Sequence, residues 1–181
     1  FPYMGYFQKM EKADLFVVLD NVNYRKNYFQ NRNRFLNNNG IEEWFTIPVE
    51  KGATKKWIKD VKVNTHIPWE KKIINKLKQN FKTDFSTIYN SESLLEINLN
   101  SIKWAREKLN ITTKMVLASE LGVNGDKSEL LANICKATNA TTYLSGPSGK
   151  DYLDIQFFNN IKIEYHNPTV DNIYSCIYNI I

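Results

Sequence analysis

Asn31-Arg32-Asn33-Arg34 is the stretch whose residue types most directly indicate binding chemistry. Each guanidinium group presents a planar pair of donors that matches phosphate or carboxylate oxygens at two points. If the stretch is a strand, Arg32 and Arg34 point to one face and Asn31 and Asn33 to the other. The stretch therefore predicts a site for a phosphate-bearing small molecule, with a solvated basic loop as the alternative.

An acidic residue precedes this stretch at a position where chemistry is expected. Asp20 follows the apolar run Leu15 to Leu19, so its carboxylate would lie at the end of a buried strand. There it could bind a metal or a ribose, or take a proton from an amine. The alternative is a turn-forming Asp whose oxygen bonds the backbone of Val22. Further candidates follow it: Asn21 and Tyr24 for substrate binding, and Lys26 for catalysis.

Gly5 lies among aromatic residues in the opening segment, ahead of a predicted short helix. Glycine lets a ligand approach the backbone closely, and the amides at a helix start favour phosphate. The arrangement resembles the signature loop of adenylate-forming nucleotide-binding folds, which activate a carboxylate with ATP. The paired histidines of that loop are absent here, and Tyr3 and Tyr6 lie nearby instead. A packed aromatic corner is the alternative interpretation.

The Gly-rich segment Ser145-Gly146-Pro147-Ser148-Gly149-Lys150 follows a predicted strand but is not a P-loop. A P-loop needs a glycine where Leu144 or Ser145 stands, and Ser or Thr in place of Asp151. The turn amides with Ser145 could still hold an anion, and Lys150 could neutralise a phosphate. A tight connection between elements is the alternative. The substrate-binding candidates here are Ser145, Gly146, Gly149, Lys150 and Tyr152.

His166 is the better of the two histidines for acid–base work. It ends a predicted strand, and an unperturbed imidazole has a pKa near neutrality; a structural histidine is the alternative. Cys135 and Cys176 are isolated, and we expect Cys135 to be a buried free thiol on a helix. No His, Cys or Asp cluster has metal-ligand spacing, so we expect no structural metal held by the protein.

Strands and helices alternate along the chain. Strands are expected over Leu15 to Leu19, Glu43 to Val49, Ile58 to Val63, Lys114 to Ala118, Thr141 to Leu144 and Ile161 to Tyr165. Helices are expected from Pro68 to Phe81, from Ser93 to Leu109 with a capping box, from Asp126 to Thr138, and from Val170 to the end. Asn37-Asn38-Asn39-Gly40 is the strongest turn signal.

This order predicts a single α/β domain over 1–181 with a helical portion at about 68–110. We expect a mainly parallel, Rossmann-like sheet with helices on both faces, an arrangement similar to that of adenylate-forming nucleotide-binding folds. Ligands of such sheets collect at the carboxyl ends of the strands, which are the segments after Leu19 and Leu144.

Composition excludes several classes of protein. The 181 residues are 43% hydrophobic, which is typical of a globular protein, and the longest purely apolar run is too short for a bilayer. We therefore expect a cytoplasmic protein without a membrane span. The net charge of +5 invites a nucleic-acid interpretation, but the abundance of Lys, Asn and Ile indicates compositional drift. A phosphate-bearing substrate such as a nucleotide sugar fits the charge equally well, and the oligomeric state stays open.

Several separated motifs occur in one order along nearly the whole chain. They are Phe1-Pro2-Tyr3-Met4-Gly5-Tyr6-Phe7, Ala13-Asp14-Leu15-Phe16-Val17, Asp20-Asn21-Val22, Tyr24, Lys26, Asn31 to Arg34, Trp44 to Val49, Lys51-Gly52, Tyr143-Leu144-Ser145-Gly146, Gly149-Lys150 and Tyr152-Leu153. Together they resemble the WbqC-like protein family. The family usually begins on an earlier strand, so we expect residues upstream of Phe1, and also a longer segment between Tyr165 and Asp171.

The resemblance implies a role in bacterial surface-polysaccharide (O-antigen) biosynthesis, as a transferase that decorates an amino sugar. We expect an acyl or aminoacyl transferase, or an amide ligase that uses ATP with Mg, acting on an amino sugar carried by a nucleotide. A non-catalytic nucleotide- or nucleic-acid-binding module is the alternative. A scaffolding member of a polysaccharide assembly complex is a third.

Overall fold

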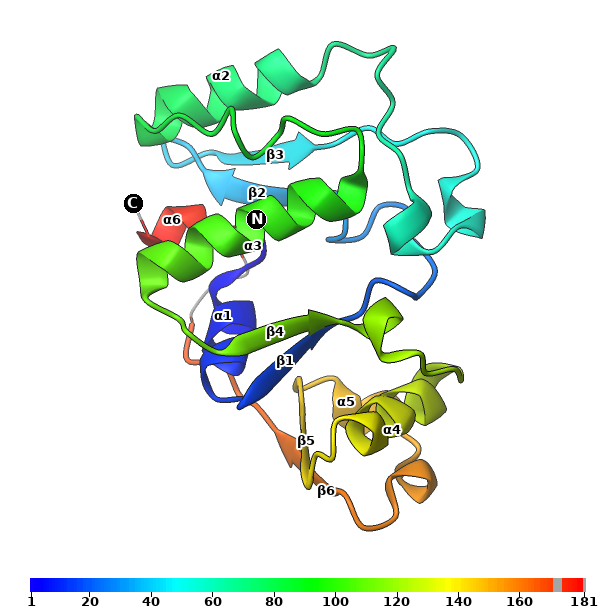
Figure 1. The fold of residues 1–181 in the computed structure, drawn as a ribbon. Coiled ribbons are helices and arrows are strands. Elements are labelled where there is room, and N and C mark those ends of the chain that lie inside the picture. Colours follow the sequence, from blue (N-terminus) through cyan, green and yellow to red (C-terminus); the bar gives the residue numbers. More distant parts are fainter. Residues whose placement is uncertain (171–173, 181) are drawn as a thin grey trace. The chain divides into compact units, whose positions relative to one another are not determined.

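Two compact units make up the chain in a computed structural model that describes residues 1–170 and 174–180 (Figure 1). Unit 1 consists of Phe1–Phe7, Asp20–Thr112 and Val170–Ile181, and unit 2 of Gln8–Leu19 and Thr113–Thr169. The helices are α1 (Met4–Glu11), α2 (Glu70–Phe81), α3 (Leu94–Leu109), α4 (Lys127–Ala137), α5 (Gly149–Tyr152) and α6 (Ile177–Ile180). The strands are β1 (Leu15–Val18), β2 (Arg32–Leu36), β3 (Glu42–Thr46), β4 (Lys114–Leu117), β5 (Thr142–Ser145) and β6 (Lys162–Tyr165).

The strands of the described residues form three two-stranded sheets. β1 pairs with β4 and β5 with β6, both in parallel, whereas β2 and β3 are antiparallel. The α/β class predicted from the alternation is therefore confirmed. A single mainly parallel, Rossmann-like sheet is not confirmed, because no hydrogen-bonded ladder joins the parallel pairs within the described segments.

The β2–β3 hairpin is the framework of unit 1. Asn37 and Gly40 form its turn, in which the Gly40 amide donates to the Asn37 carbonyl at 2.9 Å. Gly40 has a φ of 72°, a conformation that glycine adopts without a steric penalty. The Asn-Gly turn predicted from the sequence is thus confirmed, and it sets the register that places Arg34 opposite Trp44.

Helix α2 packs on this hairpin with an apolar stripe. Ile73 and Leu77 are buried, and the rings of Phe35 on β2 and Phe81 on α2 meet edge to face at 5.1 Å. The stripe follows the helical period predicted from the sequence. Pro68 was expected at the first helical position, but the helix begins at Glu70, because Trp69 takes the N-cap position and accepts from the Ile73 amide.

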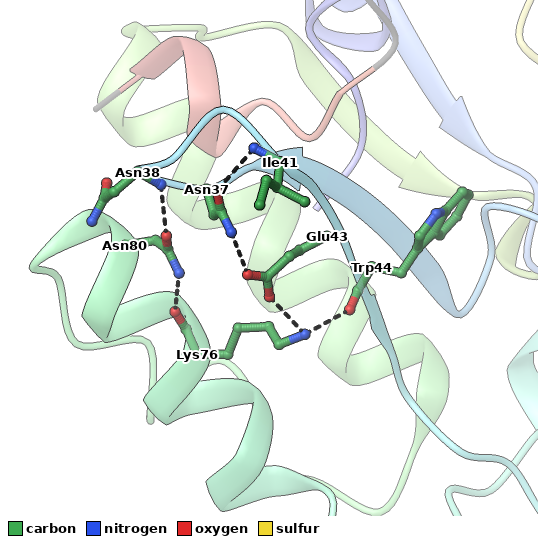
Figure 2. A network of polar contacts seen from close by, with 7 residues as sticks. All are labelled: Asn37, Asn38, Ile41, Glu43, Trp44, Lys76 and Asn80. Atoms are coloured by element: carbon green, nitrogen blue, oxygen red, sulfur yellow. Dashed lines mark hydrogen bonds and ion pairs between the residues drawn. The ribbon is translucent and has the colours of Figure 1, made fainter.

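A network of polar contacts ties the hairpin turn to α2, as Figure 2 shows. The Lys76 ammonium lies 2.9 Å from the Glu43 carboxylate and donates to the Trp44 carbonyl at 3.1 Å. The Asn37 side chain donates to the other Glu43 oxygen at 2.7 Å. Asn80 accepts from the Asn38 amide at 3.2 Å and donates to the Lys76 carbonyl at 2.9 Å. The hairpin and the helix are therefore held in one geometry.

We expect Lys76→Met to make stability less dependent on pH in the acid range. The hydrogen bond from Asn37, and then the Lys76 ammonium, lower the pKa of Glu43 from its ordinary 4.5. Because this pKa is depressed on folding, its stabilisation is complete above pH 4.5 and is lost as pH falls through the lower folded value. Because the Glu43–Lys76 pair is partly exposed, we expect Lys76→Met to lower the free energy of unfolding by less than about 1 kcal/mol at pH 7.

Urea unfolding of wild type and Lys76→Met at pH 7 and pH 3 measures this dependence. Lys71→Met, an exposed site on the same helix, is the matched control and should match wild type at both pH values. If Lys76→Met lost the same free energy of unfolding at both pH values, the conclusion that Lys76 lowers the pKa of Glu43 would be contradicted.

Helix α3 begins as its capping signal predicts. The Ser93 side chain accepts from the Glu96 amide at 3.4 Å, and the helix runs to Leu109. Leu94, Ile97 and Ile102 on its inner face are buried. An aromatic corner adjoins it, in which Phe1 meets the rings of Phe85, Tyr89 and Trp104 edge to face.

Two sequence predictions in unit 1 are wrong. The strand expected over Ile58 to Val63 is a short 3₁₀ helix, Ile58–Asp60, followed by isolated bridges of Lys62 and Val63. Ile58, Val61 and Val63 are nevertheless buried, although they do not form one continuous strand.

The helix expected from Val170 to the end is confined, within the described residues, to Ile177–Ile180. The backbone amides of Ser175 and Cys176 donate instead to the carbonyls of Arg34 and Pro2, at 2.8 Å each, and this pairing replaces helical bonds. Residues 171–173, where the longer segment expected before Asp171 would end, lie outside the described residues, as does residue 181.

Unit 2 is built on its two parallel strand pairs and α4. Ala132 and Cys135 on α4 pack with Phe158 in a buried cluster. Tyr143 of β5 lies against Phe158, and their ring centroids are 5.3 Å apart. Cys135 is buried and free, as expected; Cys176 in unit 1 is also buried and free. The helix predicted from Asp126 is confirmed as Lys127–Ala137, although no side chain caps its start.

Candidate functional site

Strand β2 presents its arginines on one side and its asparagines on the other. Asn31 and Asn33 are buried, and their side-chain amides donate to the carbonyls of Ile47 and Phe1 at 2.8 and 2.7 Å. Arg32 and Arg34 are partly exposed. The predicted alternation is therefore observed, and the asparagines fasten the strand while the arginines remain accessible.

The two arginines share one aromatic ring, Trp44 of β3. The guanidinium carbons of Arg32 and Arg34 lie 4.6 and 5.2 Å from its ring centroid, within the range of cation–π attraction. The ring of Phe29 stacks on Trp44 at 6.3 Å, with 26° between the planes. Phe29, Arg32, Arg34 and Trp44 form what we call the arginine–aromatic platform, which lies entirely in unit 1.

The arginines of the platform differ in how far their charge is compensated. Arg34 makes an ion pair with Glu42 at 3.0 Å. Arg32 donates to the Asn27 carbonyl at 2.6 Å and makes no ion pair with any carboxylate of the described residues. The Arg32 charge is thus the one most available to an anionic ligand.

The charge of the chain is concentrated in unit 1. The unit contains 17 Lys and Arg and 11 Asp and Glu, a net charge of +6, whereas unit 2 contains 7 and 8, a net charge of −1. The moderate positive charge of the whole chain is therefore a property of the unit that carries the platform. A positive unit raises the local concentration of anionic ligands.

The other candidates of unit 1 are mostly buried. Asp20 is 1% exposed, its backbone carbonyl accepts from the Lys59 amide at 3.0 Å, and it lies two residues beyond β1. Tyr24 is buried, and burial raises its pKa, whereas Lys26 is exposed. Asn21 is partly buried.

The opening motif lies at the start of α1. Tyr3 makes an isolated bridge to Ser175, and Gly5 is a buried residue of the helix itself. Burial raises the pKa of Tyr6, and the nearby Arg106 opposes that shift. The phenols of Tyr3 and Tyr6 therefore stay protonated at neutral pH, where they act as hydrogen-bonding groups.

Ser145 and His166 lie at the carboxyl ends of the paired strands β5 and β6 in unit 2. The His166 amide donates to the Ser145 carbonyl at 2.8 Å, and both side chains are buried. Gly149 packs directly over the Ser145 hydroxyl, so that a Cβ at this position would overlap Ser145 Oγ. Gly146 has open space around it instead.

Lys150 and Tyr152 belong to the one-turn helix α5. The Lys150 ammonium lies 5.3 Å from the centroid of the Tyr165 ring, and Tyr152 is exposed. The predicted site residues are thus divided between the units. Lys150, Tyr152, Ser145, Gly146, Gly149 and His166 belong to unit 2, and the others belong to unit 1.

Trp44 was not among the sequence-predicted site residues. Its motif was recognised, but only the hairpin register shows that it lies opposite Arg34. The Asn-Gly turn and the period of two in each strand were the available signal.

The described residues contain neither a metal-binding cluster nor a membrane-spanning helix. No group of three or more His, Cys, Asp or Glu residues in them could hold a metal ion. No helix among them is long and apolar enough to cross a bilayer.

Comparison with known proteins gives one family and one curated relative. The model of the WbqC-like protein family matches residues 1–179. "Uncharacterized protein Rv1507c" of Mycobacterium tuberculosis (strain ATCC 25618 / H37Rv) is 29% identical over 175 residues, which cover 90% of this chain and 75% of that protein. No solved structure matches the chain significantly.

Proposed function

The chain belongs to the WbqC-like protein family, and from this premise we propose that it forms an amide on a nucleotide-linked amino sugar for bacterial surface polysaccharide. The observation that carries the proposal is the arginine–aromatic platform, in which Arg32 and Arg34 lie over Trp44. Guanidinium groups bind the diphosphate, and the aromatic faces stack on the base or the sugar. The net charge of unit 1 favours the same ligand.

The remaining candidates take the chemical roles in this proposal. The amine must be neutral to attack the acyl carbonyl, so a base accepts its proton. Asp20 or His166 is proposed for this role, and Lys26 is proposed to bind the phosphates together with Arg32 and Arg34. Ser145, Gly146, Gly149 and Lys150 contribute anion binding, and Tyr3, Tyr6, Asn21, Tyr24 and Tyr152 contribute hydrogen bonds or stacking. The reaction takes place in the cytoplasm under this proposal, with an activated acyl donor, or with ATP and Mg in a ligase version.

We expect Arg32→Ala and Trp44→Leu each to weaken binding of a nucleotide sugar such as UDP-N-acetylglucosamine by about tenfold, since each removes one side of the platform. Isothermal titration measures the affinity. Trp57→Leu is the matched control, because Trp57 is also an exposed tryptophan of unit 1 with a cation, Lys59, 5.4 Å from its ring. It should bind as wild type does. Equal losses in all three variants would contradict the platform as the binding site.

Catalysis is tested by incubating the protein with nucleotide amino sugars, activated acyl donors, ATP and glycine, and then measuring product masses. A mass gain equal to the acyl group is expected in one combination. Folded protein that gives no mass gain in any of them would count against a transferase or ligase.

A second candidate is a non-catalytic nucleotide- or nucleic-acid-binding module. The guanidinium carbon of Arg25 lies 4.7 Å from the centroid of the exposed Tyr28 ring, and the ring centroids of Tyr28 and Phe29 are 5.8 Å apart. The platform therefore continues into a longer aromatic surface. Successive aromatic rings can stack successive bases of a single strand. Binding that weakens steeply with salt would favour nucleic acid, whereas a nucleotide sugar gives a shallow dependence.

A further inference from the structure

A groove of about 430 Å³ lies between β3 and the N-terminal half of α2, entirely within unit 1. Its lining includes the apolar residues Pro48, Ile67, Pro68 and Trp69, and Trp44 borders it on the β3 side. Lys72 and Lys76 of α2 also line it. The volume is within the range of about 300–1,000 Å³ that is typical of small-molecule sites.

The groove is preformed. Lys76 closes one side by bonding both the Glu43 carboxylate and the Trp44 carbonyl, as Figure 2 shows. Trp69 is 8% exposed, and its ring meets Tyr89 edge to face at 6.1 Å. A wall held by packing and by a hydrogen-bond network binds a ligand with little loss of side-chain entropy.

The charges of the groove select the ligand. Lys76 is compensated by Glu43, whereas Lys72 is exposed and makes no ion pair in the part of the chain that the structure describes. No Asp or Glu lines the groove, so it lacks the carboxylates that would favour an amine. An apolar body that carries one carboxylate complements this surface.

Trp44 connects the groove to the platform. It lines the groove, and its ring, which points away from Lys76 in Figure 2, lies under Arg32 and Arg34. The groove and the platform therefore meet at this one residue of β3, and both belong to unit 1.

We propose that the β3–α2 groove binds a small carboxylic acid with an aryl or branched apolar body, held by Lys72 and packed against Ile67 and Trp69. This inference rests on the proposed function in one respect only, which is that the acid is then the acyl source in the ATP-dependent version of the reaction. There ATP phosphorylates or adenylates the carboxylate, and the amine of the sugar displaces phosphate or AMP as the amide bond forms. The binding itself is independent of nucleotide binding.

Phenylacetate is the probe, with its neutral amide, phenylacetamide, as the matched ligand. The full chain has four tryptophans, so its indole N–H signals in ¹H–¹⁵N spectra report binding separately. We expect phenylacetate to shift the Trp69 signal with a Kd of about 1 mM, while Trp57 and Trp104 stay unchanged. Phenylacetamide should bind on the order of fivefold more weakly, because it lacks the charge.

Lys72→Met keeps the length of the side chain and removes its charge, and we expect it to weaken phenylacetate binding about fivefold. Lys71→Met, which changes the preceding exposed lysine, should bind as wild type does. Arg32→Ala should leave phenylacetate binding unchanged. The test of the groove therefore does not depend on whether the platform binds a nucleotide sugar.

Several results would overturn the proposal. They are equal affinity for acid and amide, equal losses in the Lys71 and Lys72 variants, no saturable shift, or a shift at Trp69 with a neutral sugar but not with phenylacetate.

Discussion

Phe85→Ala is expected to lower the free energy of unfolding by about 3–5 kcal/mol, the range for truncating a fully buried phenylalanine. Phe85 is fully buried, and its ring meets Phe1 and Trp104 edge to face at 5.3 Å each. Alanine would leave a cavity in this corner and would remove both aromatic contacts. Urea unfolding, followed by circular dichroism, measures the loss.

The same corner positions the platform, because the Phe1 carbonyl accepts from the Asn33 side chain on β2. Tyr28→Ala serves as the control, since Tyr28 is about half exposed and its truncation should cost less than about 1 kcal/mol. A Phe85 variant as stable as the Tyr28 variant would show that the aromatic corner is not a core of unit 1.

Gly149→Ala is expected to destabilise unit 2 by about 1–3 kcal/mol, the range for overpacking a buried site. A Cβ at this position would overlap the hydroxyl of Ser145, which is itself fully buried, and would crowd Leu153. Gly149 is a residue of α5, where alanine would otherwise be favoured by about 1 kcal/mol. The prediction therefore requires that the steric overlap cost more free energy than the helix propensity of alanine gains.

Two variants in the same loop make this test specific. Gly146→Ala meets no atom within 4 Å and should change stability by less than about 0.5 kcal/mol. Ser145→Gly removes the overlapping atoms, so the Gly149→Ala change should cost much less in that background, a coupling seen in a double-mutant cycle. A stable Gly149→Ala protein would contradict the close packing of glycine on Ser145.

Local sequence signals were sufficient where neighbouring residues determine the conformation. Ser93 and Glu96 predicted the start of α3, and Asn37 to Gly40 predicted the hairpin turn, because a cap or a turn requires only a few consecutive residues. The alternation of Asn31 to Arg34 predicted that the arginines and the asparagines lie on opposite faces of a strand, and the structure shows that the asparagine face is buried. Capping, turn geometry and strand period are physical properties of short segments, so they can be read without the fold.

Long-range pairing was decided by the tertiary structure. The C-terminal segment forms less helix than its pattern predicts, because the Ser175 and Cys176 amides bond to residues more than a hundred positions away. The Rossmann-like sheet was inferred from the order of the elements, but order does not specify which strands share a hydrogen-bonded ladder.

The sequence by itself determined the family resemblance, the α/β class and the choice of Arg32 and Arg34 as candidate binding residues. Tertiary structure determined that both arginines lie over Trp44, that Gly149 covers Ser145, and that Lys76 and Trp69 enclose a groove. The physical reason is that a residue type fixes which interactions a side chain can make. The fold of the whole chain fixes which distant groups come close enough to make them.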